Sequence, residues 1–593
     1  MIEGNSIALL RCWMKENSIA VFVCNNSDPY LSEYPADYWK VRTWLSGFTG
    51  SNGLLAVTPN AAALWSDSRY TLQAAAELDG ETVSFFNESL PETPSLFEWI
   101  EGLSVARGST VALDGRTFCI GYIRRVEDFC NQYDYKLEPS LCPADELWRN
   151  RPPLLFNTVY LMPPEYTGRE THDKLADIRA EMRKKEAAGL IITALDEAAW
   201  CFNLRGGDMD CSPLAYASAY ISSDRAILFT EVSKATPELL EYLYRQGVIV
   251  AELGKWESFI TSLSSREALW IDPVKCNALF DSLTAAHTKI YEPSPVELLK
   301  SIKNPAEIEG ERNAILFDGV ALCRLFKWIE ESINNGVPLR EAQVAEKIEE
   351  IRNTHPAYIG ESFAAIVGYG ANGAIVHYSP QRGKDAEIKP GSLLLIDTGA
   401  HYIHGTTDIT RTIALGKPTP EMRRDFTLVL KGHIALATAV FPEGTRGAQL
   451  DVLARQFLWR EGLAYLHGTG HGIGFVLNVH EGPQSIRLQE NPVALQPGML
   501  LSNEPGYYKE TNYGIRCENA MLVTEHSVTD SGRFLQFETL SLFPFDAGLI
   551  ALSLLSDDER KWINDYHQNV YEKLSPFLDA DEREWLIQKT AAL

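Results

Sequence analysis

Acidic residues inside strand-like stretches constrain the fold of this chain most, and they fall within one segment, residues 396–519. Asp397 closes the apolar run 393–396, and Asp408 lies in a stretch rich in Thr and Ile, residues 405–413. Both compositions are typical of buried β-strands. A carboxylate buried in such a strand needs a compensating charge nearby.

The two stretches predict a β-hairpin whose loop covers residues 401–404. If Ala400 pairs with Gly405, then Asp397 lies directly opposite Asp408, and both carboxylates point off the same face, about 5 Å apart. Two negative charges at that distance repel each other strongly.

The pattern recurs further along the chain. Residues 499–504 and 514–523 predict another hairpin, with Glu504 on one strand and Glu518 on the other. Taken singly, an acid on a strand more often faces solvent, but four acids that each abut an apolar run favour a shared buried site. Two divalent cations would neutralise the four carboxylates.

A histidine between glycines completes the set. His471 lies in the run 468–474, where flanking glycines allow the backbone to approach a bound group closely. A lone histidine is usually structural, so the neighbouring acids carry the argument. The run fails as a dinucleotide fingerprint, because Ile473 and Phe475 stand where a third glycine is needed.

Length and charge narrow the class of protein. The chain has 593 residues, which predicts three or four domains. With 54 basic and 79 acidic residues its net charge is −25, which argues against nucleic acid or an anionic membrane as partner. The 10 cysteines form no Cys-x-x-Cys pair, and the start lacks the features of a signal peptide. We therefore expect a cytoplasmic protein without membrane spans.

The first part of the chain, residues 1–150, predicts an α/β domain. Its elements are a helix at 6–16, a strand at 19–23 and a hairpin formed by 53–57 and 61–65. Residues 142–168 are rich in Pro and polar side chains and predict a linker.

A second α/β domain is predicted over residues 155–300, because the pattern of the first begins again. Residues 182–186 and 190–192 echo 14–16 and 19–23, and the sequence at 203–206 echoes that at 44–47. This repetition favours a duplicated domain.

A third domain, residues 304–545, begins with a helix cap. Asn304 can cap the first turn, Pro305 suits the first helical position and Glu307 completes a capping box. Helices and hairpins then alternate, an α+β order. The tail, residues 546–593, predicts two helices that pack on this domain or at a dimer contact.

Six motifs in this order resemble aminopeptidase P, the Xaa-Pro aminopeptidase of the pita-bread metallopeptidases, in its long three-domain form. They are Asp-Thr-Gly-Ala at 397–400, Gly-Thr-Thr-Asp-Ile-Thr-Arg-Thr at 405–412, His-Gly-Thr-Gly-His-Gly-Ile-Gly at 467–474, Asn-Val-His-Glu-Gly-Pro at 478–483, Asn-Glu-Pro-Gly-Tyr-Tyr at 503–508 and Gly-Ile-Arg-Cys-Glu-Asn at 514–519. The resemblance implies two creatinase-type amino-terminal α/β domains, a pita-bread catalytic domain and a short helical tail.

The resemblance also implies a division of labour among five ligands for two divalent metal ions. Asp397 would hold one ion, His471 and Glu504 the other, and Asp408 and Glu518 would bridge both. An oxygen-rich set suits manganese best, with zinc or cobalt able to substitute. A hydroxide shared by the two ions would attack the peptide bond, with Glu504 as the proton shuttle.

Further residues match family positions around the substrate. His377 and His480 would donate to the carbonyl oxygen, and His467 would shape the proline pocket. Arg516 would lie near the cleft or support the carboxylates by an ion pair. Arg69, in the first domain, would either contact substrate or form a surface salt bridge.

Three positions depart from the family pattern. His404 stands where an acid is common, Phe475 replaces a smaller residue, and Cys517 separates Arg516 from Glu518 and would be sensitive to oxidation if accessible. None of the five implied ligands is affected.

The resemblance implies a homodimeric enzyme acting on peptides with proline in second position. Prolidase, which shares the metal set but cleaves dipeptides, is the nearest alternative, and methionine aminopeptidase lacks the upstream domains. A binding module like the peptidase-like domain of the FACT histone chaperone would have lost the ligands, which are intact here.

Overall fold

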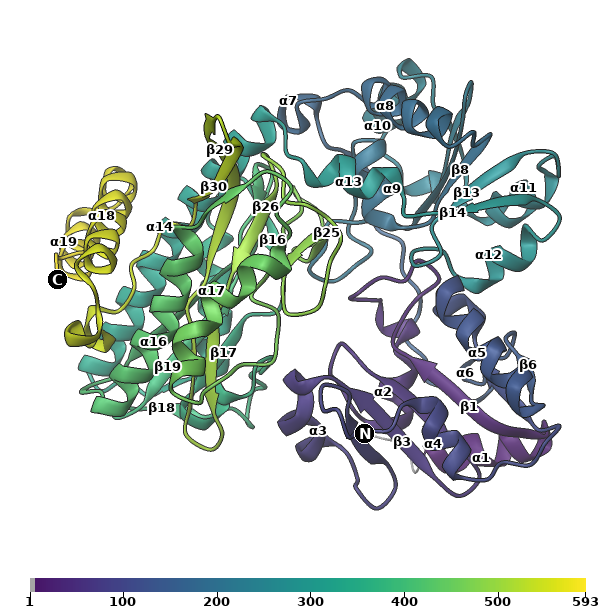
Figure 1. Ribbon diagram of the computed structural model, residues 1–593, viewed down its shortest axis with the longest axis horizontal. Helices are drawn as coiled ribbons and strands as arrows, with labels where there is room; N and C mark the ends of the chain where they lie inside the picture. The colour runs from purple at the N-terminus through teal and green to yellow at the C-terminus, as the bar shows by residue number, and fades with distance from the viewer. Residues whose placement is uncertain (1–5) are drawn as a thin grey trace. The chain divides into compact units, whose positions relative to one another are not determined.

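The computed structural model describes residues 6–593, which form two compact units. The first unit comprises residues up to Pro164 together with Arg169–Glu297, and the second comprises Glu165–Gly168 and Leu298–Leu593 (Figure 1). Within residues 6–593, no helix has both the length and the apolar character that crossing a membrane requires.

The first unit contains two six-stranded sheets with the same plan. The first runs β4-β3-β2-β1-β5-β6 and the second β12-β11-β10-β8-β13-β14, and corresponding neighbours are parallel or antiparallel in the same way. In sheet order the strands are Ser84–Asn87, Ala62–Ser66, Leu54–Val57, Ile19–Asn25, Thr110–Leu113 and Lys136–Glu138, then Ile249–Glu252, Ala226–Thr230, Ala217–Ser222, Gly189–Ile192, Ala268–Ile271 and Thr288–Tyr291. The repetition of plan confirms the predicted duplication.

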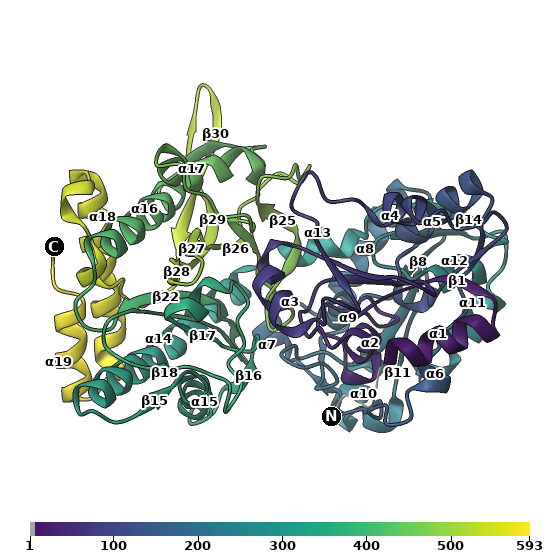
Figure 2. The same ribbon diagram turned by 90° about the horizontal axis from the view of Figure 1, so that it is seen from below.

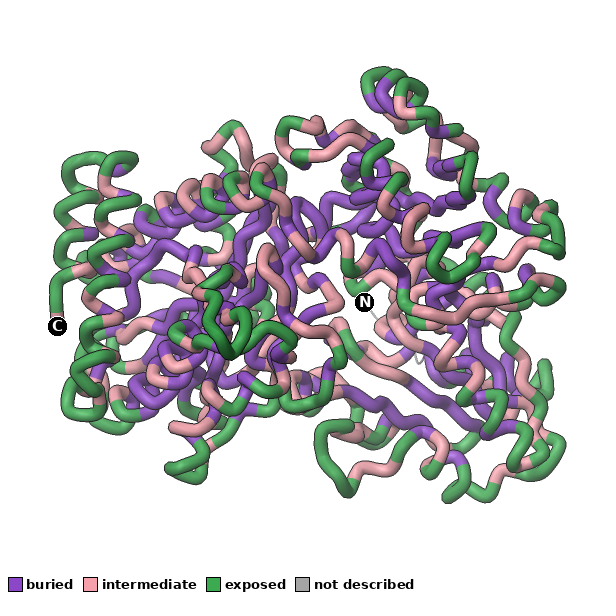
Figure 3. The backbone as a smooth tube through the Cα atoms, turned by 45° about the horizontal axis from the view of Figure 1, so that its top comes forward, coloured by how far each residue is buried: buried purple, intermediate pink, exposed green. Residues whose placement is uncertain are grey.

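Helices cover these sheets and bury their apolar faces. In chain order they are α1 (Ser6–Glu16), α2 (Val41–Ser46), α3 (Thr71–Glu77), α4 (Leu96–Gly102), α5 (Ile120–Tyr133), α6 (Ala144–Leu147), α8 (Thr171–Lys184), α9 (Leu195–Cys201), α10 (Pro237–Arg245), α11 (Trp256–Ser262) and α12 (Ala278–Leu283). Separate cores lie on the two faces of the first sheet. Figure 3 shows buried residues following the central strands, while exposed residues gather on outer helices and loops.

The predicted linker is partly wrong. Cys142, Leu147 and Trp148 pack against one core of the first sheet, and β7 (Tyr160–Leu161) pairs with β9 (Leu204–Arg205). Apolar side chains within the Pro-rich stretch draw its two ends into the neighbouring cores.

The second unit begins as predicted. The Asn304 side chain accepts hydrogen bonds from the N–H groups of Ala306 and Glu307, and Glu307 returns a bond to the Asn304 N–H, forming the capping box of α14 (Pro305–Asn334). The other long helices are α15 (Glu341–Arg352), α16 (Pro420–Ala437) and α17 (Gly447–Arg460), with α16 packed on α17 and α14 on α15.

Strands of the second unit form one large sheet and several small ones. The large sheet runs β23-β30-β29-β26-β24-β25, and the small ones are β17-β19-β22, β16-β20-β21, β27-β28 and β15-β18. Their bounds in the same order are Val440–Pro442, Gly532–Thr539, Asn519–Thr529, Leu500–Asn503, Gly470–Gly472, Glu481–Ile486, Ile366–Tyr369, Leu393–Thr398, Ile409–Ala414, Tyr358–Glu361, Ala400–Tyr402, Gly405–Thr406, Gly506–Lys509, Tyr513–Arg516, Leu339–Arg340 and Glu387–Ile388.

Two capped helices form the tail, as predicted. Ser556 and Glu559 make the capping box of α18 (Asp557–Leu574), and Asp579 and Glu582 make that of α19 (Ala580–Lys589). Both helices lie beside α14 (Figures 1 and 2). Their apolar faces belong to the main core of the second unit, so the tail packs on the third predicted domain.

The predicted register of the first hairpin is wrong by two residues. Tyr402 pairs with Gly405 and Asp397 with Thr410, so Asp397 does not lie opposite Asp408. The turn is limited to residues 403–404, and the ladder is interrupted at 407–408 between β21 and β22. Asp408 therefore leaves the strand rather than projecting from it.

The second hairpin is interrupted in the same manner. β26 pairs with β29 as predicted, ending at Asn503 opposite Asn519. A separate hairpin, β27–β28, is inserted between these strands. Glu504 directly follows Asn503, the last residue of β26, and Glu518 directly precedes Asn519, the first residue of β29. Of the four acids, only Asp397 lies within a strand.

Candidate metal centre

Ladder ends and interruptions bring the acids and the histidine together. One ligand atom each of Asp408, His471 and Glu518 lies within 4.8 Å of the others. His471 Nε2 lies 3.4 Å from an Asp408 carboxylate oxygen and 3.5 Å from Glu504 Oε1. Of the five predicted ligands, these four form one cluster.

Asp397 joins this cluster through Arg516. The guanidinium pairs with the Asp397 carboxylate, and its Nε donates to Thr410 Oγ1 at 3.1 Å. Thr410 in turn donates to Glu518 Oε2 at 2.6 Å. One arginine thus ties Asp397 to the opposite side of the cluster, which supports the ion-pair interpretation of Arg516.

A buried ion pair fixes the chain between the two aspartates. Arg352 on α15 donates to both oxygens of Asp318 on α14, at 2.8 and 3.1 Å. Arg352 also donates to Thr398 Oγ1 and to the Gly399 carbonyl. Thr407 donates to Asp318 at 3.0 Å. The segment between Asp397 and Asp408 is therefore held at both ends by the Arg352–Asp318 ion pair.

Only a glycine fits at position 399, where the backbone passes close to Thr407. A Cβ atom there would collide with the Thr407 carbonyl oxygen. The Thr407 hydroxyl also accepts from the Ala400 N–H, and Ser362 binds the Thr407 carbonyl. This close approach produces the break in the ladder that turns Asp408 toward the other ligands.

Hydrogen bonding orients His471. Its Nδ1 lies 2.9 Å from the Gly472 carbonyl and must donate to it, which leaves the Nε2 lone pair directed at the carboxylates. Ser502 accepts from the His471 N–H and lies 3.3 Å from Glu504 Oε1. A carbonyl partner at the far nitrogen is the usual arrangement of a metal-ligating imidazole.

Electrostatics favour bound cations. Burial, and then the charge of Asp397, raises the pKa of Asp408 well above its usual range. Burial, and then the charge of Asp408, does the same for Glu518. Burial raises the pKa of Glu504 to about 7, with Asp397 adding to the shift and Arg516 opposing it. Carboxylates that repel each other in this way gain most from a shared positive charge.

An orphaned atom tests whether metal ions fit. Asp397 Oδ1 is buried and has no hydrogen-bond partner within the described chain. A buried carboxylate oxygen without a donor is costly unless another group binds it. Together with the oxygen-rich donor set, this observation shows that the residues suit divalent cations.

His467 is joined to the cluster through Tyr508. Its Nδ1 lies 2.7 Å from the Gly468 carbonyl, so Nε2, 2.9 Å from the Tyr508 hydroxyl, accepts. Arg516 donates to the same hydroxyl at 2.7 Å. Tyr508 therefore connects the imidazole with the Asp397 side of the site.

The other predicted residues differ in how closely they approach. The His480 ring stacks edge-on against His471, with centroids 4.3 Å apart. His377 lies in a turn after the 3-10 helix η6 (Gly370–Ala374), which contacts β19 and β28. Arg69 belongs to the first unit and binds Asp67 with two hydrogen bonds of 2.8 Å. A contact between Arg69 and substrate stays a prediction.

The three departures lie outside the ligand set. Cys517 is 1% exposed, and burial raises the pKa of its thiol to about 12. Cys517 is therefore not accessible, which was the condition for its sensitivity to oxidation. His404 forms the tight turn and contacts Phe317 edge-on, and Phe475 is buried.

Several supporting residues escaped sequence analysis. Glu481 forms ion pairs with the buried Lys300 and Lys303, directly after His480. Arg411 donates to the Glu518 carbonyl and to the Tyr566 hydroxyl on α18. Lys303 lies 178 residues from Glu481 and Tyr566 lies 155 residues from Arg411, so local sequence patterns could not predict these contacts.

Family profiles match almost the whole chain. Two described as the Creatinase/Prolidase N-terminal domain match residues 7–139 and 150–307. The profile of metallopeptidase family M24 matches residues 309–525, and that of the C-terminal region of peptidase M24 matches 533–593. The fold and the clustered ligands thus define an M24 metallopeptidase with creatinase-type N-terminal domains.

Full-length relatives narrow this class, and the chain belongs to the Xaa-Pro aminopeptidase P family. A probable Xaa-Pro aminopeptidase P of Sordaria macrospora is 38% identical, over 99% of this chain and 98% of the relative. Aminopeptidase P2 of Arabidopsis thaliana is 37% identical, over 100% of this chain and 89% of the relative. A solved structure with TM-score 0.93 is the X-prolyl aminopeptidase of Caenorhabditis elegans, which is described as a cytosolic enzyme with a di-nuclear active site. It is 31% identical, and the match covers 97% of this chain and 95% of that one.

A solved Xaa-Pro dipeptidase shares the fold over a smaller part. The enzyme of Bacillus anthracis has TM-score 0.52 and 22% identity, and its match covers 64% of this chain and 99% of that one. This match therefore shows a shared fold over part of this chain only.

Proposed function

We propose that this chain is a metal-dependent Xaa-Pro aminopeptidase, which releases the first residue of peptides that have proline second. The observation that carries the proposal is the convergence of four predicted ligands, with the fifth, Asp397, offering a buried oxygen that lacks a partner. The names of full-length relatives support the same activity.

In this proposal two divalent ions, manganese by preference, occupy the cluster. Asp397 would hold one ion, His471 and Glu504 would hold the other, and Asp408 and Glu518 would contact both. Bound ions would lower the pKa of water and so supply a nucleophile near neutral pH. Zinc and cobalt also suit this donor set.

Glu504 moves the proton. A carboxylate beside the attacking water can accept a proton from it and give that proton to the departing nitrogen, which is the role proposed for Glu504. The new C–O bond forms first, and the scissile C–N bond then breaks as the departing nitrogen takes the proton. The products are a free amino acid and a peptide that begins with proline.

Histidines provide selectivity in this proposal. An Xaa-Pro bond has no N–H, so a site that relies on that donor would fail on it. His377 and His480 instead donate to the carbonyl oxygen as it gains negative charge. His467, held by Tyr508, lines the proline pocket.

We propose a cytoplasmic homodimer. The location is supported by the description of the nematode relative as cytosolic, and the dimer by the family resemblance. Light scattering coupled to size-exclusion chromatography measures the mass directly, and a mass near 66.3 kDa would contradict the dimer.

The activity is tested with an Xaa-Pro-Xaa tripeptide and the matching Xaa-Pro dipeptide, each with added manganese and with chelator. We expect metal-dependent release of the first residue from the tripeptide and little from the dipeptide. The reverse preference would indicate a prolidase, and metal-loaded protein inactive on both would refute the proposal.

A further inference from the structure

A buried carboxylate at the start of α15 collects hydrogen bonds from one loop. Glu341 has no exposed surface. Its carboxylate accepts from the N–H of Tyr369 at 2.7 Å, the amide of Asn372 at 3.0 Å, the hydroxyl of Tyr378 at 2.8 Å and the N–H of Ala386 at 2.7 Å. All four donors belong to residues 369–386, the loop that contains His377.

The side-chain donors lie on either side of His377. Asn372 lies in η6, and Tyr378 is the next residue after the histidine. Asn372 also donates to the Tyr378 hydroxyl at 3.0 Å. Burial, and then the hydrogen bond to Glu341, raises the pKa of Tyr378, so its hydroxyl keeps the proton that it donates.

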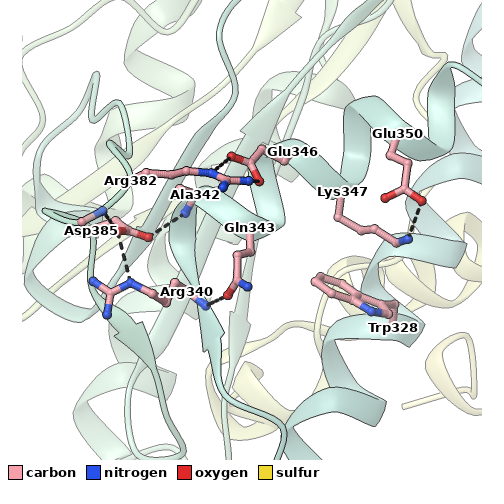
Figure 4. Close-up of a pocket in the computed structure, with 10 residues that line it drawn as sticks. Trp328, Arg340, Ala342, Gln343, Glu346, Lys347, Glu350, Arg382 and Asp385 are labelled. Atoms are coloured by element: carbon pink, nitrogen blue, oxygen red, sulfur yellow. Dashed lines mark hydrogen bonds and ion pairs between the residues drawn. The ribbon is translucent and has the colours of Figure 1, made fainter.

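The far end of the loop is held to the same helix start. Asp385 accepts from the Ala342 N–H at 3.1 Å and pairs with Arg340 (Figure 4). β15 pairs with β18 just beyond. The loop is therefore tied to the first turn of α15 at both of its ends.

A surface pocket of about 660 Å³ lies beside the start of α15 and the end of this loop. The cations that line it, Arg340, Lys347 and Arg382, each pair with an acid beside them (Figure 4). Glu341 is not among the residues that line this pocket, and its carboxylate is fully buried.

A close backbone approach holds η6 to the site. A Cβ atom on Gly514 would collide with the Gly373 carbonyl oxygen. Gly514 lies in β28, which ends at Arg516, the partner of Asp397. Because η6 packs this closely on β28, and β28 carries Arg516, a displacement of η6 would change its position relative to the proposed metal ligands.

We propose that Glu341 is a positioning residue, which fixes the loop so that His377 can donate to the substrate carbonyl oxygen. The inference rests on the proposed aminopeptidase function. A carboxylate suits the task because it presents only acceptors to four donors. A glutamine of the same shape would turn an NH2 group toward part of this set, leaving donors facing donors in a buried site.

The test compares Glu341→Gln with the wild-type enzyme on an Xaa-Pro-Xaa tripeptide. We expect kcat to fall about 10- to 100-fold, because a displaced donor loses interactions made in the transition state. KM should change less than about twofold, since ground-state binding is spared. Manganese affinity measured by calorimetry should stay within about twofold, because no ligand contacts Glu341.

A double-mutant cycle assigns the loss to the histidine. In a His377→Ala background, Glu341→Gln should lower kcat by less than about twofold, because the group that it positions is gone. Glu350→Gln is the matched control: this acid lies on the same helix but pairs at the surface with Lys347, which is on that helix and outside the loop. It should leave kcat unchanged.

Tyr378→Phe provides a second variant if Glu341→Gln fails to fold, since it removes one donor and adds none. It should lower kcat in the same way by a smaller factor. Unchanged kcat in folded variants, an equal loss with and without His377, or a loss of manganese affinity would overturn the inference. Inactive wild-type enzyme would instead refute the proposed function.

Discussion

Arg516 serves three partners with one guanidinium: Asp397, Thr410 and Tyr508. A lysine carries the charge but lacks the planar fork, so it can satisfy only part of this set. We expect Arg516→Lys to weaken manganese binding about 10- to 100-fold, as loss of a group that orients metal ligands usually does. Isothermal calorimetry measures the affinity.

The control for this prediction is Arg312→Lys. Arg312 pairs with Glu538 on the surface, where an ion pair contributes about 0–1 kcal/mol. Manganese affinity should be the same in this variant as in the wild-type protein. An equal loss in both variants would show that the effect is not local to the centre.

His567 makes stability depend on pH. Burial, and then the charge of Arg411, lowers its pKa to about 4, against about 6.5 in an unfolded chain. Between these values the unfolded state binds a proton that the native state does not. The contribution is therefore complete above pH 6.5 and falls toward pH 4 by about 1.4 kcal/mol per pH unit.

We expect His567→Gln to flatten this dependence. The glutamine oxygen can accept the Phe545 N–H, as His567 Nε2 does at 3.1 Å, but it does not titrate. The difference in melting temperature between pH 7 and pH 5, measured by calorimetry, should be smaller in the variant. An unchanged difference would mean that His567 does not contribute to acid instability.

The interruption between β21 and β22 places Asp408, and the Thr407 hydroxyl maintains it. Thr407→Val keeps the shape but removes the donor to Asp318 and the acceptor for the Ala400 N–H. Each unsatisfied buried group costs about 1–3 kcal/mol. We therefore expect a lower melting temperature and weaker manganese binding, measured by calorimetry.

Thr407→Ser is the matched comparison, because it retains the hydroxyl. We expect its manganese affinity to stay near the wild-type value. If Thr407→Val bound manganese as tightly as Thr407→Ser, the interval between Asp397 and Asp408 would not depend on this hydroxyl.

Elements with local signals were predictable, whereas those set by tertiary contacts were not. Asn304 forms the expected capping box, and Ser556 and Asp579 cap the two predicted tail helices in the same way, because capping depends on residues three positions apart. The hairpin register failed because Thr407 is held by Asp318, far away in the sequence. Composition can identify two strands, but a hydrogen bond from another helix decides where they part.

At the scale of the molecule, the motifs indicated the class of protein and the duplication, and the structure confirms both. The clustering of Asp408, His471 and Glu518 was predicted from acids beside apolar runs and a histidine between glycines, whereas the division of the ligands between two ions came from the resemblance. The anchors Arg352, Glu341 and Glu481 could not be predicted, since a buried charge is recognised only through its partners. Domain boundaries and ligand roles remain predictions.

Metal binding should stabilise only one of the two compact units. All five proposed ligands lie between Asp397 and Glu518, within the second unit. A ligand at 100 times its Kd stabilises the native state by about 2.7 kcal/mol. We expect manganese to slow hydrogen exchange in peptides from residues 298–593, measured by mass spectrometry, and chelator to reverse this. Equal slowing in peptides from the first sheet would contradict it.

The bond between Arg411 and Tyr566 has a consequence for biosynthesis. Arg411 holds the Glu518 carbonyl, but its own partner, Tyr566, lies on a helix near the end of the sequence. A nascent chain that has released every proposed ligand from the ribosome therefore still lacks the group that completes their support. We therefore expect the support of the Glu518 carbonyl to be complete only after Tyr566 has left the ribosome and α18 has folded.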